Sequence, residues 1–413
     1  MHTAPIFSQK IVNDPVHGFI TIPNALAFDL IEHPYLQRLR NIKQLGMSNL
    51  VYPGAVHNRF QHTLGAMHLM VEALQVLKDK GVAITREEEE GAIAAILLHD
   101  LGHGPFSHAL EHSFAKKTSH ELLSLAFMNQ INREMNGRLD LAIAIFTNQY
   151  SKKFLHQLVS SQLDVDRLDY LRRDSFFSGV AEGTIGVERI IKMLYVLSDE
   201  LVVEAKGIYS IEKFLIARRM MYWQVYLHKT VVGAEQMLIA ILRRARELVG
   251  QGISLFTSPR LHYFLSGRNE VEPVESWLNT FAGLDDSDIT LAIKEWASHS
   301  DPVLADMCSR LNNRHLLRVE LSGTPFSPER VKLVKEICQS KMNLSEIHAG
   351  YLCFAGEVTN SFYNPKQESI KILFKNNRLE DIYSASEMLN HSALANTVKK
   401  YFFCYPKEVA HWI

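Results

Sequence analysis

The sequence predicts a mainly α-helical protein with a small α+β region towards its C-terminal end. Between residues 24 and 249, apolar side chains recur at the three- and four-residue spacing of helices. Strand-like patterns are confined to residues 11–22 and to short stretches late in the chain. The 413 residues can bury a large core. We expect an N-terminal extended segment (residues 1–23), a helical core (24–265) and a C-terminal α+β region (266–413).

The N-terminal segment is expected to form short extended stretches around a turn at Val16, His17 and Gly18. The most informative helix of the core follows later and starts at a capping box, in which Thr85 is followed three residues on by Glu88. Residues 92–98 are apolar on every side, which is typical of a buried helix. The His-Asp pair at positions 99 and 100 therefore emerges at the end of a core helix.

Helix-breaking residues follow this pair. Gly102, Gly104 and Pro105 end the helix. We expect the next two helices to begin near Ser107 and near Ser119.

Two later helices are predicted to carry polar side chains along one face. Asp166, Tyr170 and Asp174 are four residues apart, so they lie along one side of a helix. A second such line is formed by Arg218, Tyr222, Tyr226 and Lys229. After residue 265 the pattern becomes mixed, and residues 368–375 and 401–405 are predicted strands.

Composition and charge exclude several classes of protein. The hydrophobic content of 47%, with 22% charged residues, is ordinary for a soluble globular protein. A net charge of −1 provides no general attraction for nucleic acid or anionic membrane. The four cysteines form no Cys-x-x-Cys pair, and neither a signal peptide nor an apolar stretch of membrane-spanning length is present. We expect a soluble protein of the reducing cytoplasm.

Histidine and aspartate together predict a metal site. Eight of the 19 histidines fall between His57 and His120. A single buried histidine is more often a hydrogen-bonded core residue, but several here stand beside structural breaks that expose them. His62, His99, Asp100 and Asp166 offer nitrogen and oxygen ligands without sulfur, which suits Mn, Fe, Mg, Ni, Co or Zn. The protein would hold one divalent ion, and Asp100 could bridge a second one completed by substrate phosphate.

Five segments resemble the HD-domain deoxynucleoside triphosphate triphosphohydrolases, above all the branch of the vertebrate enzymes that combine a SAM and an HD domain. These segments are residues 38–46, 53–62, 98–108, 164–170 and 226–229. The resemblance covers roughly residues 10–250, and no segment resembles a SAM domain. It implies a helical HD-domain core and metal-dependent hydrolysis of deoxynucleoside triphosphates (dNTPs), dGTP among them. Water would attack the α-phosphorus and release deoxynucleoside and triphosphate.

By resemblance, His62, His99, Asp100 and Asp166 are the metal ligands. The resemblance also implies the catalytic residues His103, His108, Glu111 and His120. A 5′ alkoxide is a poor leaving group, so an imidazolium that protonates it matters. Glu111 stands where the family usually has the shorter Asp, and simple helix capping or solvent exposure is the alternative for His108 and His120.

The resemblance implies a substrate pocket with a basic part and a sugar-binding part. The triphosphate candidates are Arg59, Arg167, Arg218 and Lys229. The sugar and base candidates are Gln44, Leu45, Tyr170, Asp174, Tyr222 and Tyr226. An aromatic face against the deoxyribose would exclude a 2′-hydroxyl. Arg167 stands where the vertebrate enzyme has Lys, and Tyr222 where it has His.

A second, activating nucleotide site at a subunit interface is also implied. It would contain Lys10, Ile11, Asn13, Glu32, Gln37 and Arg40. Glu32 stands where the vertebrate enzyme has Asp, and an ordinary surface salt bridge between Glu32 and Arg40 is the alternative. We expect a homo-oligomer, either a dimer or a tetramer.

Two other functions stay open at this point. The first is an HD phosphohydrolase that acts on nucleoside monophosphates or cyclic nucleotides, against which the basic and sugar-binding sets argue. The second is a nucleic-acid-binding protein, which the net charge of −1 and the lack of a long basic stripe disfavour.

Overall fold

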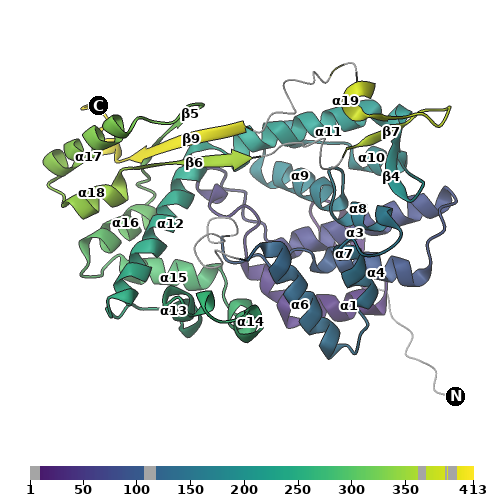
Figure 1. Ribbon diagram of the computed structural model, residues 1–413, viewed down its shortest axis with the longest axis horizontal. Coiled ribbons are helices and arrows are strands. Elements are labelled where there is room, and N and C mark those ends of the chain that lie inside the picture. The colour runs from purple at the N-terminus through teal and green to yellow at the C-terminus, as the bar shows by residue number, and fades with distance from the viewer. Residues whose placement is uncertain (1–9, 107–117, 361–368, 387, 389–397) are drawn as a thin grey trace.

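The computed structural model describes residues 10–106, 118–360, 369–386, 388 and 398–413. Helices make up most of the molecule, and the strands labelled in Figure 1 lie along one side, beside α11 (Ile208–Met221) and α17 (Pro328–Met342). The prediction of a mainly α-helical fold with a small C-terminal α+β region is confirmed.

The N-terminal extended stretches form an antiparallel hairpin. Strand β1 (Ile11–Asp14) pairs with β2 (Gly18–Thr21), and Val12 lies opposite Ile20. Gly18 has φ +77°, a left-handed conformation that favours glycine. The predicted turn is therefore confirmed. Helices α1 (Ala25–Glu32) and α2 (Pro34–Gln37) follow, and two short 3₁₀ turns, Arg38–Asn41 and Ser48–Leu50, lead towards the core.

Three core helices carry the HD segment. They are α3 (Arg59–Asp79), α4 (Arg86–Leu98) and α9 (Val165–Ser178). The capping box of α4 is confirmed, because Thr85 Oγ1 accepts from the N–H of Glu88 at 3.2 Å and Glu88 Oε2 accepts from the N–H of Thr85 at 2.8 Å. Residues 92–98 are buried, as predicted.

The helix expected near Ser119 is α6 (His120–Glu134), with Ser119 as its cap. The helix expected near Ser107 lies outside the described residues. Further helices of the first two thirds are α7 (Asp140–Phe146), α8 (Lys153–Val159), α10 (Val187–Met193), α11 (Ile208–Met221) and α12 (Lys229–Gly250). Those of the last third are α13 (Pro259–Leu265), α14 (Val274–Ala282), α15 (Asp286–Trp296), α16 (Pro302–Asn312), α17 (Pro328–Met342), α18 (Glu346–Leu352) and α19 (Ile382–Ala385).

One predicted helix is interrupted. Helix α11 ends at Met221, residues Tyr222–Tyr226 form a π-helical turn, and α12 starts anew at Lys229 with His228 as its cap. The two helical stretches meet at an angle of 56°. The expectation that Lys229 continues the line of polar residues on α11 is therefore wrong, because the chain changes direction before it. Among the described helices none is by itself both long and apolar enough to cross a bilayer.

The strands form two further sheets. Strand β9 (Val398–Tyr405) lies between β5 (Arg318–Ser322) and β6 (Phe354–Asn360), and pairs with both in antiparallel register. The other sheet has the order β3 (Leu194–Leu197), β4 (Glu200–Glu204), β7 (Lys371–Leu373) and β8 (Leu379–Asp381). Both predicted C-terminal strands exist, although β7 fills only Lys371–Leu373 of its predicted stretch.

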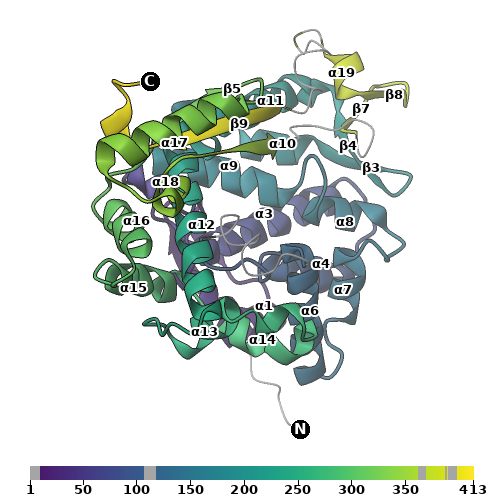
Figure 2. The same ribbon diagram turned by 60° about the vertical axis from the view of Figure 1, so that its left-hand side comes forward.

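The second sheet joins distant parts of the chain. Strand β4 precedes α11, whereas β7 comes from the C-terminal region, and the two pair in parallel with Val203 opposite Ile372. Figure 2 shows β4 and β7 next to each other beyond the end of α10. The C-terminal region therefore completes a sheet that begins in the first half of the chain.

Candidate metal centre and substrate site

Two histidines and an aspartate from three helices meet at one point. His62 comes from the first turn of α3, His99 is the cap residue of α4, and Asp166 lies in the first turn of α9. The Nε2 atom of His62 is 3.1 Å from Asp166 Oδ1, and that of His99 is 3.5 Å from the same oxygen. One ligand atom from each residue lies within 4.8 Å of the others. Three residues that are far apart in the sequence thus place their candidate ligand atoms close together.

The two histidines are arranged as metal ligands. Their Nδ1 atoms are engaged: that of His62 lies 2.7 Å from Asp169 Oδ2, and that of His99 lies 2.6 Å from the carbonyl oxygen of Ile96. Their Nε2 atoms are buried and have no hydrogen-bond partner among the described residues. Partners at Nδ1 fix the tautomer that leaves Nε2 as the ligand atom. The residues therefore fit a divalent cation, with Nε2 of both rings and a carboxylate oxygen pointing to the same place.

Electrostatics point to a cation at the same place. Burial lowers the pKa of His62, but Asp166 and Asp169 outweigh it and raise the pKa to about 10. Burial also lowers the pKa of His99, and Asp100 and Asp166 raise it above its usual value. The surrounding carboxylates thus favour positive charge between the two rings, which is the charge that a metal ion brings.

Asp100 lies beside this group and is shared with a buried arginine. Its Oδ1 is 3.4 Å from His99 Nε2, and its Oδ2 is 3.9 Å from His62 Nε2. Arg59 Nη1 also donates to Oδ2, at 2.5 Å. Burial raises the pKa of Asp100, but Arg59 and the histidines hold it well below its usual range. All four predicted ligands are therefore close together, with Asp100 already paired on one side.

A second layer of charges holds His62 in place. The carboxylate of Asp169 contacts His62 and two further residues. It accepts a hydrogen bond from Arg173 Nε at 2.9 Å, and its Oδ1 lies 2.6 Å from His17 Nε2. Arg173 also donates to Asp14, at the end of strand β1. Asp169 was not among the predicted site residues, although it follows Asp166 by three residues and therefore shares its face of α9.

Glycine at position 65 makes this approach of α3 and α9 possible. A Cβ atom at Gly65 would be 2.0 Å from Asp169 Oδ1 and 2.3 Å from Arg173 Nη2. A glycine three residues after a ligand histidine was the signal in the sequence for a tightly packed partner on that face.

Next to the ligands, two predicted catalytic histidines stack on each other. The rings of His103 and His120 are 4.3 Å apart with an interplanar angle of 17°, and His103 Nε2 is 3.4 Å from Asp100 Oδ1. Burial, and next Arg59, lower the pKa of His103 to about 3. The other two predicted catalytic residues, His108 and Glu111, lie outside the described residues.

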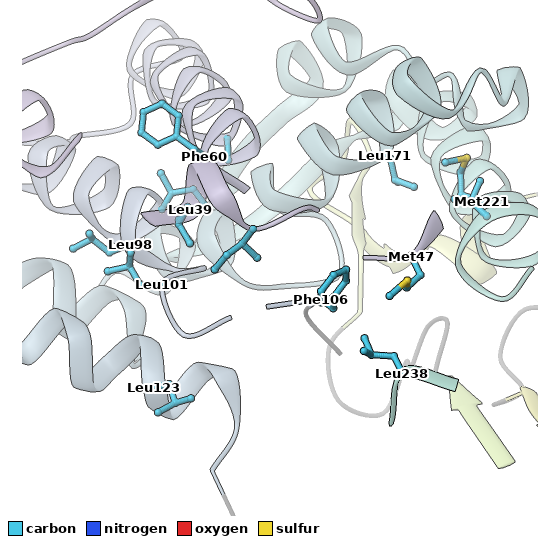
Figure 3. Close-up of a cluster of buried hydrophobic side chains, with 14 of the residues drawn as sticks. Leu39, Met47, Phe60, Leu98, Leu101, Phe106, Leu123, Leu171, Met221 and Leu238 are labelled. Carbon is cyan, nitrogen blue, oxygen red and sulfur yellow. The ribbon is translucent and has the colours of Figure 1, made fainter. Parts of the chain in front are cut away.

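Helix α6 packs directly against the turn that carries His103. A Cβ atom at Gly102 would lie 1.9 Å from the carbonyl oxygen of His120. Ser124 Oγ accepts from the N–H of Gly102 at 2.9 Å and donates to the carbonyl oxygen of His99 at 2.5 Å. Leu98, Leu101 and Phe106 belong to the buried apolar cluster, which also includes Leu123 of α6 (Figure 3).

The predicted phosphate-binding arginines have partners within the protein. Arg167 is paired with Asp164, the cap residue of α9, and Arg218 Nη1 donates to Gln162 Oε1 at 3.1 Å. Arg59, as described above, pairs with Asp100. Lys229 is exposed at the start of α12. The structure therefore brings basic groups towards the metal-ligand helices but gives each arginine an internal acceptor.

The sugar-binding candidates form an aromatic and carboxylate group. Asp174 Oδ2 accepts from the hydroxyl of Tyr226 at 2.7 Å, and its Oδ1 lies 2.7 Å from His57 Nε2, a residue to which the sequence analysis gave no role. Tyr226 contacts the rings of Tyr170, at 6.3 Å, and Tyr222, at 5.0 Å.

The loop with Gln44 and Leu45 adds the last sugar candidates. Both residues are half-buried, and Gln44 Oε1 is buried without a hydrogen-bond partner among the described residues. The N–H of Gln44 donates to the carbonyl oxygen of His57 at 3.0 Å. This loop therefore runs beside the segment that leads into α3.

The residues of the predicted activator site lie on the N-terminal hairpin and the helical turns after it. Lys10 Nζ is 3.9 Å from the centre of the Phe28 ring, and Ile11 is exposed. Arg40 donates to Gln37 Oε1 at 2.8 Å, and its guanidinium lies 3.7 Å from the centre of the Phe60 ring.

The remaining two activator candidates are Asn13, on β1, and Glu32, at the end of α1. Within the described residues, the contacts of Arg40 do not include an ion pair with Glu32. Arg40 contacts Gln37 and the ring of Phe60 instead.

Comparison with known proteins defines the class. Residues 59–174 match the HD domain model, and residues 185–253 match the model of an HD-associated region. A crystal structure titled a phosphohydrolase, from Bacteroides thetaiotaomicron, is 51% identical, with a TM-score of 0.92 over 96% of this chain and 100% of that chain. An uncharacterized protein of Bacillus subtilis, YwfO, is 31% identical over 97% of this chain and 93% of its own length.

Relatives with a described activity match the first part of the chain. The deoxynucleoside triphosphate triphosphohydrolase SAMHD1 homolog of Dictyostelium discoideum is 31% identical over 56% of this chain, and human SAMHD1 is 30% identical over 54%. The match spans 48% and 42% of those proteins. The protein is an HD-domain phosphohydrolase. It belongs to the HD family that includes the deoxynucleoside triphosphate triphosphohydrolases.

Proposed function

We propose that this protein hydrolyses deoxynucleoside triphosphates, dGTP among them, to deoxynucleoside and triphosphate. The observation that carries the proposal is the pair of buried Nε2 atoms of His62 and His99, which face Asp166 and lie beside the stacked rings of His103 and His120. The SAMHD1 relatives are named as deoxynucleoside triphosphate triphosphohydrolases, which supports the substrate class.

His62, His99, Asp100 and Asp166 would hold the divalent ion. An ion bound there supplies Lewis-acid chemistry: it neutralises charge on a phosphoryl group and makes water more acidic. Water adds to the α-phosphorus, the bond from that phosphorus to the 5′ oxygen breaks, and the oxygen leaves as the hydroxyl of the deoxynucleoside. We assign the proton that this oxygen needs to the pair of His103 and His120, with His108 and Glu111 as further candidates. Burial and Arg59 hold the pKa of His103 at about 3 in the free protein, and the negative charge of a bound triphosphate would raise it.

The same proposal assigns the rest of the pocket. Arg59, Arg167, Arg218 and Lys229 would bind the triphosphate, and each arginine would exchange its internal acceptor for a phosphate oxygen. The ring of Tyr170, with Gln44, Leu45, Asp174, Tyr222 and Tyr226 around it, would pack against the deoxyribose and its base. Leaving a buried 2′-hydroxyl unpaired there costs about 1–3 kcal/mol, which favours dNTPs over ribonucleotides.

We further propose a cytoplasmic homo-oligomer with an activating nucleotide site around Lys10, Ile11, Asn13, Glu32, Gln37 and Arg40. Two of these residues lie on the exposed hairpin, where a second subunit could complete a pocket. Measuring the sedimentation of the purified protein with and without GTP tests this. Unchanged mass and unchanged turnover on addition of GTP would contradict it.

Product analysis tests the main proposal. Purified, metal-loaded protein is incubated with each dNTP and each ribonucleotide, and the products are separated by ion-exchange chromatography. We expect triphosphate and deoxynucleoside, with dGTP turned over faster than GTP. Pyrophosphate with monophosphate, or orthophosphate with diphosphate, would contradict the site of cleavage. Hydrolysis of nucleoside monophosphates or cyclic nucleotides alone would favour the other HD phosphohydrolase activity.

A further inference from the structure

A carboxylate from the C-terminal region joins two loops of the proposed active site. Asp286 is the first residue of α15, and its side chain is buried. Its Oδ1 accepts a hydrogen bond from the backbone N–H of Phe106 at 2.8 Å, and its Oδ2 accepts one from the backbone N–H of Lys43 at 3.1 Å. Each oxygen of one carboxylate thus holds a different loop.

Both loops carry residues of the proposed reaction. Lys43 directly precedes the sugar candidates Gln44 and Leu45. Phe106 ends the described part of the segment that begins with His99 and includes His103. The loop of the proposed sugar site and the segment of the proposed metal site are therefore connected through Asp286, which belongs to neither site.

The two loops also touch each other. Gly46 has φ +49°, and a Cβ atom added to it would lie 3.4 Å from the carbonyl oxygen of Phe106. Phe106 has φ 51°, which is unusual for a residue with a side chain. Phe106 is strained, and its N–H donates to a buried carboxylate. The surrounding structure therefore fixes its backbone position.

Helix α15 does not need the carboxylate of Asp286 for its own start. Asp285 caps the helix by accepting from the N–H of Ser287 at 2.8 Å, and Asp288 accepts from the N–H of Asp285 at 3.0 Å. Burial raises the pKa of Asp286, against the effect of the N–H groups of Lys43 and Phe106. A carboxylate buried at this cost, and unnecessary for its helix, points to a role in the loops.

Phe281 of the C-terminal region also supports this segment, through Arg38 and Gly104. Arg38 donates to the carbonyl oxygens of Leu101, at 2.8 Å, and His103, at 2.9 Å. Its guanidinium lies 5.2 Å from the centre of the Phe281 ring on α14, and a Cβ atom at Gly104 would lie 3.1 Å from that ring. Helices α14 and α15 therefore both pack on the backbone around His103.

We propose that Asp286 is a positioning residue that sets the spacing between the loop of Gln44 and the segment of His103. The identity of the substrate rests on the proposed function, whereas the spacing of the two loops does not. A displacement of about 1 Å between reacting groups can cost on the order of 10² in rate, so loss of one of the two hydrogen bonds should appear in turnover.

The test compares Asp286→Asn with Asp288→Asn. The amide in Asp286→Asn has the shape of the carboxylate but one acceptor oxygen, so its NH₂ group faces one of the two backbone N–H groups. We expect kcat for dGTP to fall by roughly 10²-fold, with little change in KM and in metal content and with a narrower preference for dGTP over GTP. Asp288→Asn keeps an acceptor for the N–H of Asp285, removes one negative charge from the first turn of the same helix and contacts neither loop, so it should lower Tm at most slightly and leave kcat and sugar preference unchanged.

Equal kcat and equal sugar preference in the two variants would overturn the proposal, since Asp286 would then only support its helix. Hydrogen–deuterium exchange at the amides of Lys43 and Phe106 gives a readout independent of activity. We expect faster exchange at these amides in Asp286→Asn than in Asp288→Asn. If the wild type hydrolyses no dNTP, the proposed function fails, and unchanged exchange at both amides would still overturn the positioning role.

Discussion

Around His62 and His99 the internal partners leave the Nε2 atoms without a hydrogen-bond partner among the described residues, whereas Arg59, Arg167 and Arg218 are each engaged by an internal acceptor. On the metal side, Asp169 and the carbonyl oxygen of Ile96 occupy Nδ1 and leave Nε2 available. On the substrate side, Asp100, Asp164 and Gln162 accept from the three arginines. On the proposed function, the metal ligands are therefore already in place, whereas the arginines would have to exchange partners to bind a triphosphate.

This difference follows from the two kinds of ligand. A metal site needs its ligand atoms in fixed positions, and second partners provide them. A buried arginine without an anion carries a large desolvation cost, so an internal carboxylate or amide stabilises it. Four experiments, from the largest expected effect to the smallest, can break or sharpen this comparison.

Asp166→Ala should have the largest effect. It removes the oxygen that both Nε2 atoms face, without removing an apolar group from the core. We expect loss of bound metal by elemental analysis and loss of measurable turnover, with the circular dichroism spectrum retained. Glu188→Ala, which removes an exposed carboxylate paired with Arg172, is the control. Wild-type metal content and turnover in Asp166→Ala would exclude it as a ligand.

His103→Ala should keep metal and dNTP binding but lower kcat by a factor on the order of 10²–10⁴, the usual contribution of a positioned acid or base. His120→Ala should act in the same direction, because the two rings stack. Steady-state kinetics and equilibrium binding separate the two steps. Weaker binding with unchanged kcat would instead assign these residues to substrate binding.

Asp169→Asn should weaken metal binding by about 10–100-fold, the usual effect of removing the partner of a ligand histidine. An amide keeps the shape but not the charge that faces His62 and Arg173. Turnover measured against metal concentration should therefore recover at high metal. Arg172→Ala, which removes the neighbour of Arg173 on α9, serves as the control. A loss of turnover that excess metal does not restore would contradict a role in holding His62.

Gln162→Ala should have the smallest effect. Unlike the other changes, it should leave substrate binding unchanged or make it tighter. It removes an acceptor that competes with phosphate for Arg218, a hydrogen bond worth about 1 kcal/mol. We expect KM for dGTP to stay constant or to fall by up to about five-fold. Arg218→Ala, in contrast, should raise KM roughly ten-fold or more. A higher KM in Gln162→Ala would mean that Gln162 orients Arg218 for substrate rather than restraining it.

The sequence predicted those features that depend on local signals. The capping box at Thr85 and Glu88, the buried end of α4 and the line of Asp166, Tyr170 and Asp174 follow from spacing along one helix, and the structure contains them. The four predicted ligands, which stand at or near helix ends, also lie close together.

Features that depend on contacts between distant residues were not predictable in the same way. The same four-residue spacing failed at Lys229, because a π-helical turn and a bend interrupt the helix without a proline or glycine to mark them. His57, Asp169 and Asp286 act through partners that are far away in the sequence. Only the glycine at position 65 marked one of these approaches, because it is the position at which a side chain has no room.

The parallel pairing of β4 with β7 has a consequence for how the chain is made. Strand β4 leaves the ribosome long before β7, so its edge has no partner while α11, α12 and the helices after them are synthesised. Pairing across such a sequence separation is intrinsically slow, and an unpaired strand edge invites wrong contacts. The sheet that contains β4 is therefore complete only after β7 has been synthesised. The protein can then reach its final fold only near the end of translation.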